Sequence, residues 1–129
     1  MSEDSEPRPE RISDAEHAVM EALWDESPLA AADVCERVCK ERDWSMPTVK
    51  TLLGRLVNKG VIATKPDGRR FLYTPLVARA EYVGSESKRL VQRLFGGRAA
   101  PLIAHLAESE ALTDQDLTEI EALLKELRR

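Results

Sequence analysis

The chain has 129 residues, of which 43% are hydrophobic and 33% charged, with a formal net charge of −4. This size and balance suit one ordinary globular domain, or two very small ones sharing a core, and exclude a disordered chain. No apolar run approaches the roughly 20 residues that a membrane-spanning helix needs, so we expect a cytoplasmic protein with no membrane partner.

Charge is distributed unevenly along the sequence. Residues 1–44 carry a net charge of −8, residues 45–75 of +5 and residues 76–129 of −1. The acidic total therefore conceals one basic block, and the partner of that block is the main functional question that the sequence raises.

The first 44 residues predict a tail and two helices. Residues 1–10 are rich in Glu, Pro and Ser and predict a flexible tail. Residues 12–27 predict a helix that opens with a capping box of Ser13 and Glu16. After the break at SPL, residues 30–42 predict a second amphipathic helix. Its apolar stripe contains Cys35 and Cys39, which we expect to be buried thiols.

Residues 45–75 predict a third helix followed by a β-hairpin. Ser45 is a suitable N-cap, and the apolar spacing continues until Gly60 ends the helix. Two β-type runs, VIATK and RFLYTP, then flank the turn sequence PDGR. Three helices followed by a hairpin predict a winged helix-turn-helix domain over residues 11–75, in a fold that is mainly α.

The basic block falls on the two elements of such a domain that touch a DNA duplex. On the outward face of the third helix, we predict that Thr48, Thr51 and Arg55 contact base edges. We predict phosphate contacts for the flanking Ser45, Lys50 and Lys59. The hairpin adds four predicted contacts, namely Lys65, Arg69, Arg70 and Tyr73.

Gly54 lies on the same outward face and has two interpretations. A glycine in a helix interior costs about 1 kcal/mol relative to alanine. The cost is explained if a ligand approaches the backbone closely, or if a neighbouring helix packs there.

Residues 76–129 predict three helices and no strand, and Thr113 with Asp116 predicts a capping box at the start of the last helix. Apolar residues recur at alternating spacings of three and four, a pattern typical of helices that pair along a seam. So few residues bury too little surface to fold alone, and we favour a homodimer over packing against the first domain. The predicted dimerisation residues are Leu76, Ala80, Val83, Leu90, Leu94, Leu102, Leu117, Ile120, Leu124 and Leu127.

No other residue set predicts chemistry. His17 is expected on the surface, and Trp24 and Trp44 are expected to anchor the core. The two cysteines lack the further ligands that a metal site needs. We therefore expect no metal, no cofactor and no catalytic residues, and we do not expect an enzyme.

Three segments of the chain resemble the penicillinase and methicillin-resistance repressor family. They are ISDAEHAVMEALWDESPLAAADV, TVKTLLGRLVNKGVIATKPDGRRFLYTP and LVQRLFGGRAAPLIAHLAESEALTDQDLTEIEALLKEL. The similarity runs from about residue 11 to the end of the sequence. It implies a homodimer that represses resistance or stress genes by binding a palindromic operator in double-stranded DNA. It also implies that a sensor-linked protease inactivates some members by cleavage in the short C-terminal helix.

The bond that matches this cleavage site joins His105 to Leu106, where the family prefers Asn-Phe. An alternative from a different class is an adaptor whose winged domain binds an acidic protein and has no preference for a DNA sequence. Competition between a specific and a scrambled duplex separates the two hypotheses.

Overall fold

The computed structural model describes residues 11–129, so the predicted tail of residues 1–10 lies outside the described part. The chain separates into two compact units, one ending at Tyr82 and the other comprising Val83–Arg129. The first unit extends beyond the predicted limit of residue 75 because the start of α4 (Arg79–Phe95) packs within it. Within residues 11–129, no helix combines the length and apolar character needed to cross a membrane.

Three helices build the core of the first unit: α1 (Asp14–Asp25), α2 (Ala31–Arg42) and α3 (Met46–Asn58). The predicted capping box opens α1, since the Ser13 hydroxyl accepts from the Glu16 amide at 3.1 Å and the Glu16 carboxylate accepts from the Ser13 amide at 2.9 Å. Each helix turns its apolar stripe inward. The fully enclosed side chains are Val19, Met20, Leu23, Val34, Val49, Leu53 and Leu56.

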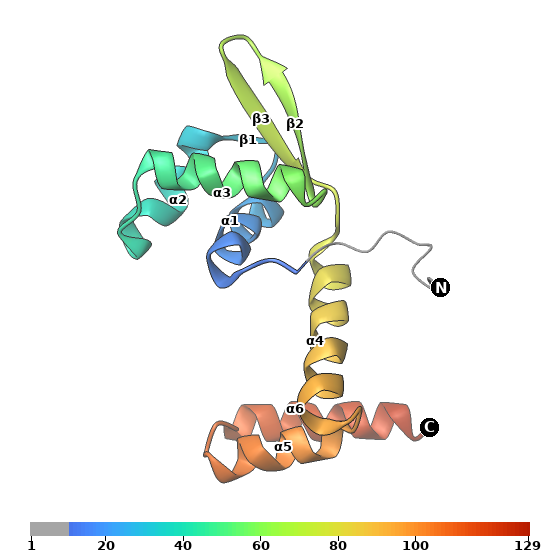
Figure 1. Ribbon diagram of the computed structural model, residues 1–129. Helices are drawn as coiled ribbons and strands as arrows, with labels where there is room; N and C mark the ends of the chain where they lie inside the picture. Colours follow the sequence, from blue (N-terminus) through green and yellow to red (C-terminus); the bar gives the residue numbers. More distant parts are fainter. Residues whose placement is uncertain (1–10) are drawn as a thin grey trace. The chain divides into compact units, whose positions relative to one another are not determined.

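The predicted hairpin is present as β2 (Ile62–Asp67) and β3 (Arg70–Pro75). Gly68 lies in its turn with a φ of +65°, a conformation that glycine adopts at little steric cost. Figure 1 shows the hairpin projecting beyond the helices of this unit. We refer to it below as the wing.

A third strand was not predicted. β1 (Leu29–Ala30) pairs with the wing, and the sheet has the order β1-β3-β2 with antiparallel neighbours. Leu29 lies opposite Tyr73, and Ala30 lies opposite Leu72. The wing is therefore joined through hydrogen bonds to the residues that lead directly into α2.

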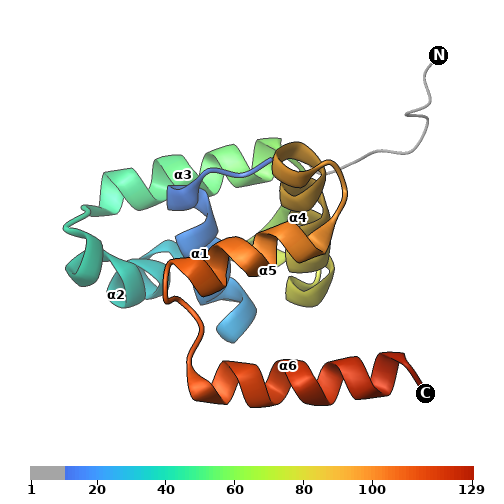
Figure 2. The same cartoon turned by 90° about the horizontal axis from the view of Figure 1, so that it is seen from below.

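The second unit contains most of α4 together with α5 (Ala99–Glu108) and α6 (Asp114–Leu127). The Thr113 hydroxyl and the Asp116 carboxylate form the predicted capping box of α6, with both hydrogen bonds at 3.0 Å. Figure 2 shows the chain reversing its direction between α5 and α6, so that the two helices run antiparallel. Neither helix contains a buried residue in the described chain.

The predictions for Leu76 and for the two cysteines need correction. Leu76 does not belong to a helical seam, because it lies in a bend before α4 begins at Arg79. Cys35 and Cys39 are not buried thiols: they form a disulfide within α2, with Cα atoms 4.9 Å apart, and both are half-buried. Their one-turn spacing placed them on the same side of the helix, where the sulfur atoms can meet.

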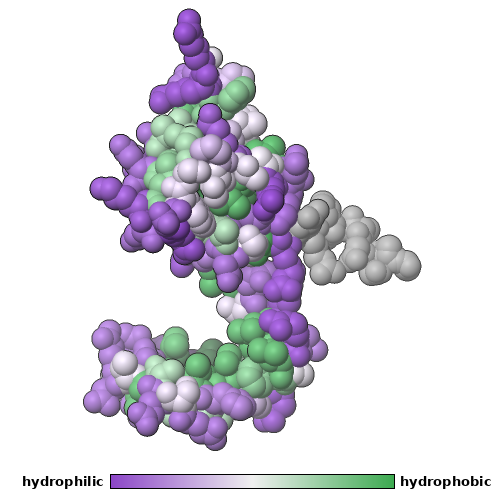
Figure 3. All heavy atoms as spheres, turned by 60° about the vertical axis from the view of Figure 1, so that its left-hand side comes forward, coloured by the Kyte–Doolittle hydropathy of each residue, from purple (hydrophilic) through white to green (hydrophobic). Residues whose placement is uncertain are grey.

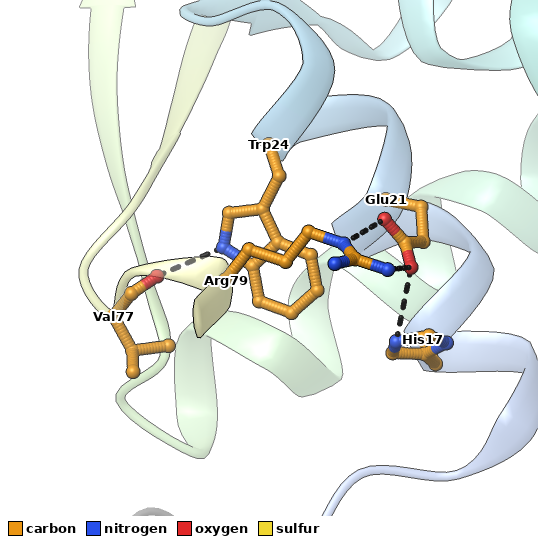
Figure 4. Close-up of polar contacts among 5 residues, drawn as sticks. All are labelled: His17, Glu21, Trp24, Val77 and Arg79. Atoms are coloured by element: carbon orange, nitrogen blue, oxygen red, sulfur yellow. Dashed lines mark hydrogen bonds and ion pairs between the residues drawn. The ribbon is translucent and has the colours of Figure 1, made fainter. Parts of the chain in front are cut away.

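His17 is also not a plain surface residue, because it belongs to a junction cluster of His17, Glu21, Trp24, Arg79 and Tyr82. Figure 4 shows these residues except Tyr82. Two hydrogen bonds of 2.8 and 3.0 Å join the Arg79 guanidinium to the Glu21 carboxylate, which also lies 3.4 Å from His17 Nε2. The hydrogen bond from Arg79 lowers the pKa of Glu21 against the opposing effect of burial.

The tryptophans pack at the edge of the core rather than at its centre. Trp24 and Trp44 are both partly buried against the core cluster. The Trp24 indole donates a 2.8 Å hydrogen bond to the Val77 carbonyl, and the Arg42 guanidinium lies 5.4 Å from the centre of the Trp44 ring. The Trp24 contact fixes the segment just before α4 to the end of α1.

Candidate nucleic-acid interface

Within residues 11–129, nothing covers the outward face of α3. Thr48, Thr51 and Arg55 are exposed, while Val49, Leu52, Leu53 and Leu56 on the opposite face are buried. The helical periodicity alone produces this separation, because residues three and four apart share one side of a helix. A face with small polar groups flanked by long cations matches what a DNA major groove accepts.

Gly54 lies at the centre of this face. A Cβ atom built there would meet nothing within 4 Å. No other part of the described chain therefore packs on this position, which excludes the neighbouring-helix interpretation within one chain. The open backbone at Gly54 leaves room for a surface that comes very close to α3.

Ser45 occupies the predicted N-cap position of α3 but does not use its side chain as a cap. Its hydroxyl lies 3.3 Å from the Thr48 hydroxyl on the exposed side of the helix. With Pro47 in the first turn, one of the amides that normally needs a cap is absent. Because the helix does not use the Ser45 hydroxyl as a cap, both hydroxyls lie exposed at the start of α3, where a ligand can reach them.

A groove of about 480 Å³ separates the start of α3 from the wing. Cations and apolar groups line it together, and its wall includes the beginning of α2. The lining residues are Ala30, Ala31, Ala32, Met46, Lys50, Arg69, Arg70, Phe71 and Tyr73. The groove thereby brings together four residues predicted from sequence to contact DNA, namely Lys50, Arg69, Arg70 and Tyr73.

The wing cations differ in their surroundings. Arg69 lies exposed in the turn, and Arg70 pairs across the turn with Asp67 at 3.2 Å. Such an exposed pair is worth 1 kcal/mol or less, roughly, so Arg70 can exchange Asp67 for another anion. Lys65 lies opposite Leu72 in the register, whereas Tyr73 lies opposite Thr64. Because side chains alternate along a strand, Lys65 faces away from the Tyr73 side of the wing.

Lys59 has an internal partner that the sequence analysis did not anticipate. Its ammonium lies 2.6 Å from the carboxylate of Glu16, whose side chain is only 3% exposed, and it also donates to the Arg11 carbonyl at 3.0 Å. Burial raises the pKa of Glu16, but the hydrogen bonds from Lys59 and Ser13 and the nearby positive charges outweigh it and lower the pKa overall. Lys59 is therefore committed to the fold and is not a free phosphate ligand.

Phe71 is a groove-lining residue that the sequence analysis missed. It is 52% exposed on β3, opposite Pro66, and it lines the groove beside the wing cations. The sequence analysis interpreted the RFLYTP run only as one strand of the hairpin, and it assigned no role to Phe71. Its position directly after Arg69 and Arg70 is the sequence signal that could have found it.

A family model and curated relatives point to the same family. The family model described as penicillinase repressor matches residues 12–126. The penicillinase repressor of Bacillus licheniformis is 30% identical over 116 residues, which cover 90% of this chain and 91% of that protein. The methicillin resistance regulatory protein MecI of Mammaliicoccus sciuri is 32% identical, over 88% of this chain and 92% of that protein.

A solved structure is similar to the first unit. It is the monomeric form of Bacillus licheniformis BlaI in complex with the blaP half-operator, at 36% identity and a TM-score of 0.51. The match covers 58% of this chain and 92% of that one. The winged-helix architecture of the first unit is thus that of a domain solved on operator DNA.

Proposed function

This chain belongs to the penicillinase repressor family, and on that premise we propose that it is a homodimeric repressor that occupies a palindromic DNA operator. Members of the family are DNA-binding regulators rather than enzymes. The observation that carries the proposal is the continuous surface formed by the open face of α3 and the cationic groove beside the wing.

In the proposed complex, α3 lies in the major groove. Thr48, Thr51 and Arg55 contact base edges, and threonine methyl groups suit thymine while arginine suits guanine. Ser45, Lys50, Arg69 and Arg70 hold the DNA backbone, with Phe71 and Tyr73 packing between them. Lys65 contributes positive charge from the other face of the wing.

The second unit supplies the proposed dimer contact. Hydrophobic side chains gather on the surface of α4 to α6 (Figure 3). The large exposed hydrophobic residues there are Leu90, Leu94, Ile103, Leu117, Leu123, Leu124 and Leu127. A second copy that covers this face would bury them, and the half-buried Val83, Leu102 and Ile120 would line the contact. Ala80, which is exposed and belongs to the first unit, would lie at the margin of this contact.

We propose that cleavage of the His105–Leu106 bond relieves repression, and that the target genes serve antibiotic resistance or stress. Both residues lie in α5, where their carbonyls accept hydrogen bonds from Ser109 and Ala111 at 3.1 and 2.9 Å. A protease needs an extended substrate, so α5 has to unwind locally before the bond is cut. Cells treated with a β-lactam should contain fragments that end at His105, while the chain stays intact in untreated cells.

The DNA-binding proposal is tested with duplexes that the full chain selects from random sequence. We expect selected sequences to be palindromic and a scrambled duplex to compete poorly. Affinity should fall with salt at a log–log slope of about −0.9 for each phosphate neutralised. Equal competition by the scrambled duplex would favour the protein-binding adaptor instead.

The dimer is tested separately, by the solution mass of the full chain at micromolar concentration. We expect the mass of two chains, because two-fold protein symmetry matches a palindromic operator. A mass of one chain under these conditions would contradict the proposed assembly.

A further inference from the structure

We propose that residues 83–87 of α4 form a hinge that sets which half-site spacings the dimer accepts. This inference rests on the proposed function, since it concerns how two DNA-binding units reach two half-sites. It follows from three features of α4: a start that is tied to the first unit, a weakened segment directly after it, and the position of that segment at the boundary between the units.

The start of α4 is held by the junction cluster. The Arg79 guanidinium forms two hydrogen bonds with Glu21 of α1, and Tyr82 is 8% exposed. The Tyr82 ring stacks on His17, with ring centres 6.1 Å apart, and lies 5.8 Å from the Trp24 ring. These contacts come from two successive turns of α1, so the first turn of α4 cannot easily rotate against the first unit.

The helix is weakened immediately after Tyr82. Gly84 lies inside α4, and a Cβ built there would meet nothing within 4 Å, so no packing contact among residues 11–129 of one chain requires a glycine. Relative to alanine, glycine lowers the preference of this position for helix by a factor of about five. Ser85 follows directly, and Gly/Ser pairs are among the few common sites of helix bending.

A side-chain hydrogen bond loosens the same turn further. The Ser87 hydroxyl donates to the Val83 carbonyl at 2.8 Å. A serine bonded to the carbonyl four residues earlier competes with the backbone amide and often bends a helix. Glu86 of the same segment forms an ion pair with Arg89 at 3.3 Å, and this pair reinforces the helix on the C-terminal side of the segment.

The weakened segment coincides with the division between the compact units, which falls between Tyr82 and Val83. A hinge is a short stretch that absorbs backbone change between rigid bodies. Adding one base pair between two half-sites rotates one against the other by about 35° and moves it by about 3.4 Å. Bending at residues 83–87 would let both units follow such a change without loosening the junction cluster.

The test is a spacing series with the full chain. Duplexes contain two copies of the half-site selected by the wild-type chain, with the spacer changed in single base-pair steps. We compare the wild type with Gly84→Ala/Ser87→Ala, which restores helix preference and removes the competing hydroxyl. The matched control is Thr118→Ala, because Thr118 makes the same type of bond, to Asp114 in α6, at 3.1 Å.

We expect the double variant to bind the optimal spacing at least as well as the wild type. On duplexes one base pair longer or shorter, it should lose about fivefold more affinity than the wild type, the factor by which alanine favours helix over glycine. The Thr118→Ala control should keep the wild-type profile. Identical profiles for the wild type and the double variant would overturn the hinge. Failure of the wild type to prefer any palindromic duplex would instead overturn the proposed function, together with the inference that rests on it.

Amide hydrogen exchange on the free protein provides a second measurement that does not depend on DNA. Amides in the turn after Gly84 should exchange faster than those near the end of α4 in the wild type, and this difference should shrink in the double variant. Uniform protection along α4 of the wild-type chain would contradict the hinge even if operator binding is found.

Discussion

The Lys59 ammonium donates a 2.6 Å hydrogen bond to the carboxylate of Glu16, and this contact ties the end of α3 to the start of α1. Glu16 is the only buried charged residue in the described chain. Its other hydrogen bond, with the Ser13 amide, completes the capping box. One carboxylate therefore fixes both the first turn of α1 and the orientation of the helix offered to DNA.

Glu16→Gln should destabilise the protein by about 2 kcal/mol, because it leaves the half-buried Lys59 without its opposite charge. The glutamine oxygen can still accept from Ser13, so the change isolates the ion pair from the cap. Denaturant unfolding of the variant measures the loss. Glu41→Gln, which removes the same charge from an exposed position, should change stability by 0.5 kcal/mol or less, roughly. Equal losses of stability in the two variants would show that the Glu16–Lys59 ion pair does not stabilise the fold.

Stability should fall in acid through Glu16 and Glu21. Both folded-state pKa values lie below the ordinary value of 4.5. A carboxylate of this kind stabilises the fold above its unfolded pKa, and the stabilisation disappears as the pH drops through the folded pKa. The free energy of unfolding should therefore be flat from neutral pH to about 5 and decline below that value. Glu16→Gln should decline less steeply in the same titration.

Gly54→Ala should have opposite effects on folding and on binding. Alanine stabilises a helix interior by about 1 kcal/mol relative to glycine, and its methyl group meets nothing within 4 Å in this chain. The same methyl group would project into the DNA interface and weaken binding to the selected duplex. Thermal unfolding and fluorescence anisotropy measure the two effects. A stabilised variant with unchanged affinity would show that DNA does not approach α3 at this position.

Arg55→Ala and Lys50→Ala should weaken binding in different ways. Loss of a base contact at Arg55 should cost about 1–3 kcal/mol on the preferred base and relax the preference at one position of each half-site. Loss of a phosphate contact at Lys50 should weaken all sequences alike and reduce the salt slope by about 1. Binding to a set of single-base operator variants at two salt concentrations distinguishes these patterns. Relaxed base preference in the Lys50 variant would reverse the assignment.

Phe71→Ala should weaken DNA binding while leaving the fold almost unchanged. The ring is 52% exposed, so its removal costs the folded chain little. Lost burial against the DNA backbone should cost about 1 kcal/mol of binding free energy. Phe71→Tyr keeps the ring and should bind nearly as well as the wild type. If both variants bind like the wild type, the groove beside the wing does not hold DNA.

Local signals in the sequence predicted most of the fold. Capping boxes predicted the starts of two helices, with Ser13 and Glu16 for α1 and Thr113 and Asp116 for α6. A capping box is complete within four residues, so it can be found from the sequence alone. β1 carried no such signal: two residues following SP form a strand only because β3 lies beside them. The same limit applies to Lys59, whose partner is 43 residues away in the sequence.

The outward face of α3 was predictable because a helix has a fixed period, and burial of its other side follows from that period. The groove was not predictable in the same way. It depends on how far the wing stands from α3, which tertiary packing decides. Leu76 shows the opposite error, since its spacing continued the heptad pattern although the chain bends there before entering α4.

The two-residue strand β1 has a consequence for recognition. Since it joins β3 directly to the start of α2, the wing and the helix-turn-helix form one hydrogen-bonded body rather than a hairpin on a loose tether. A preorganised binding surface of this kind loses little conformational entropy when it binds. We therefore expect the domain to prefer duplexes whose groove shape already matches its own.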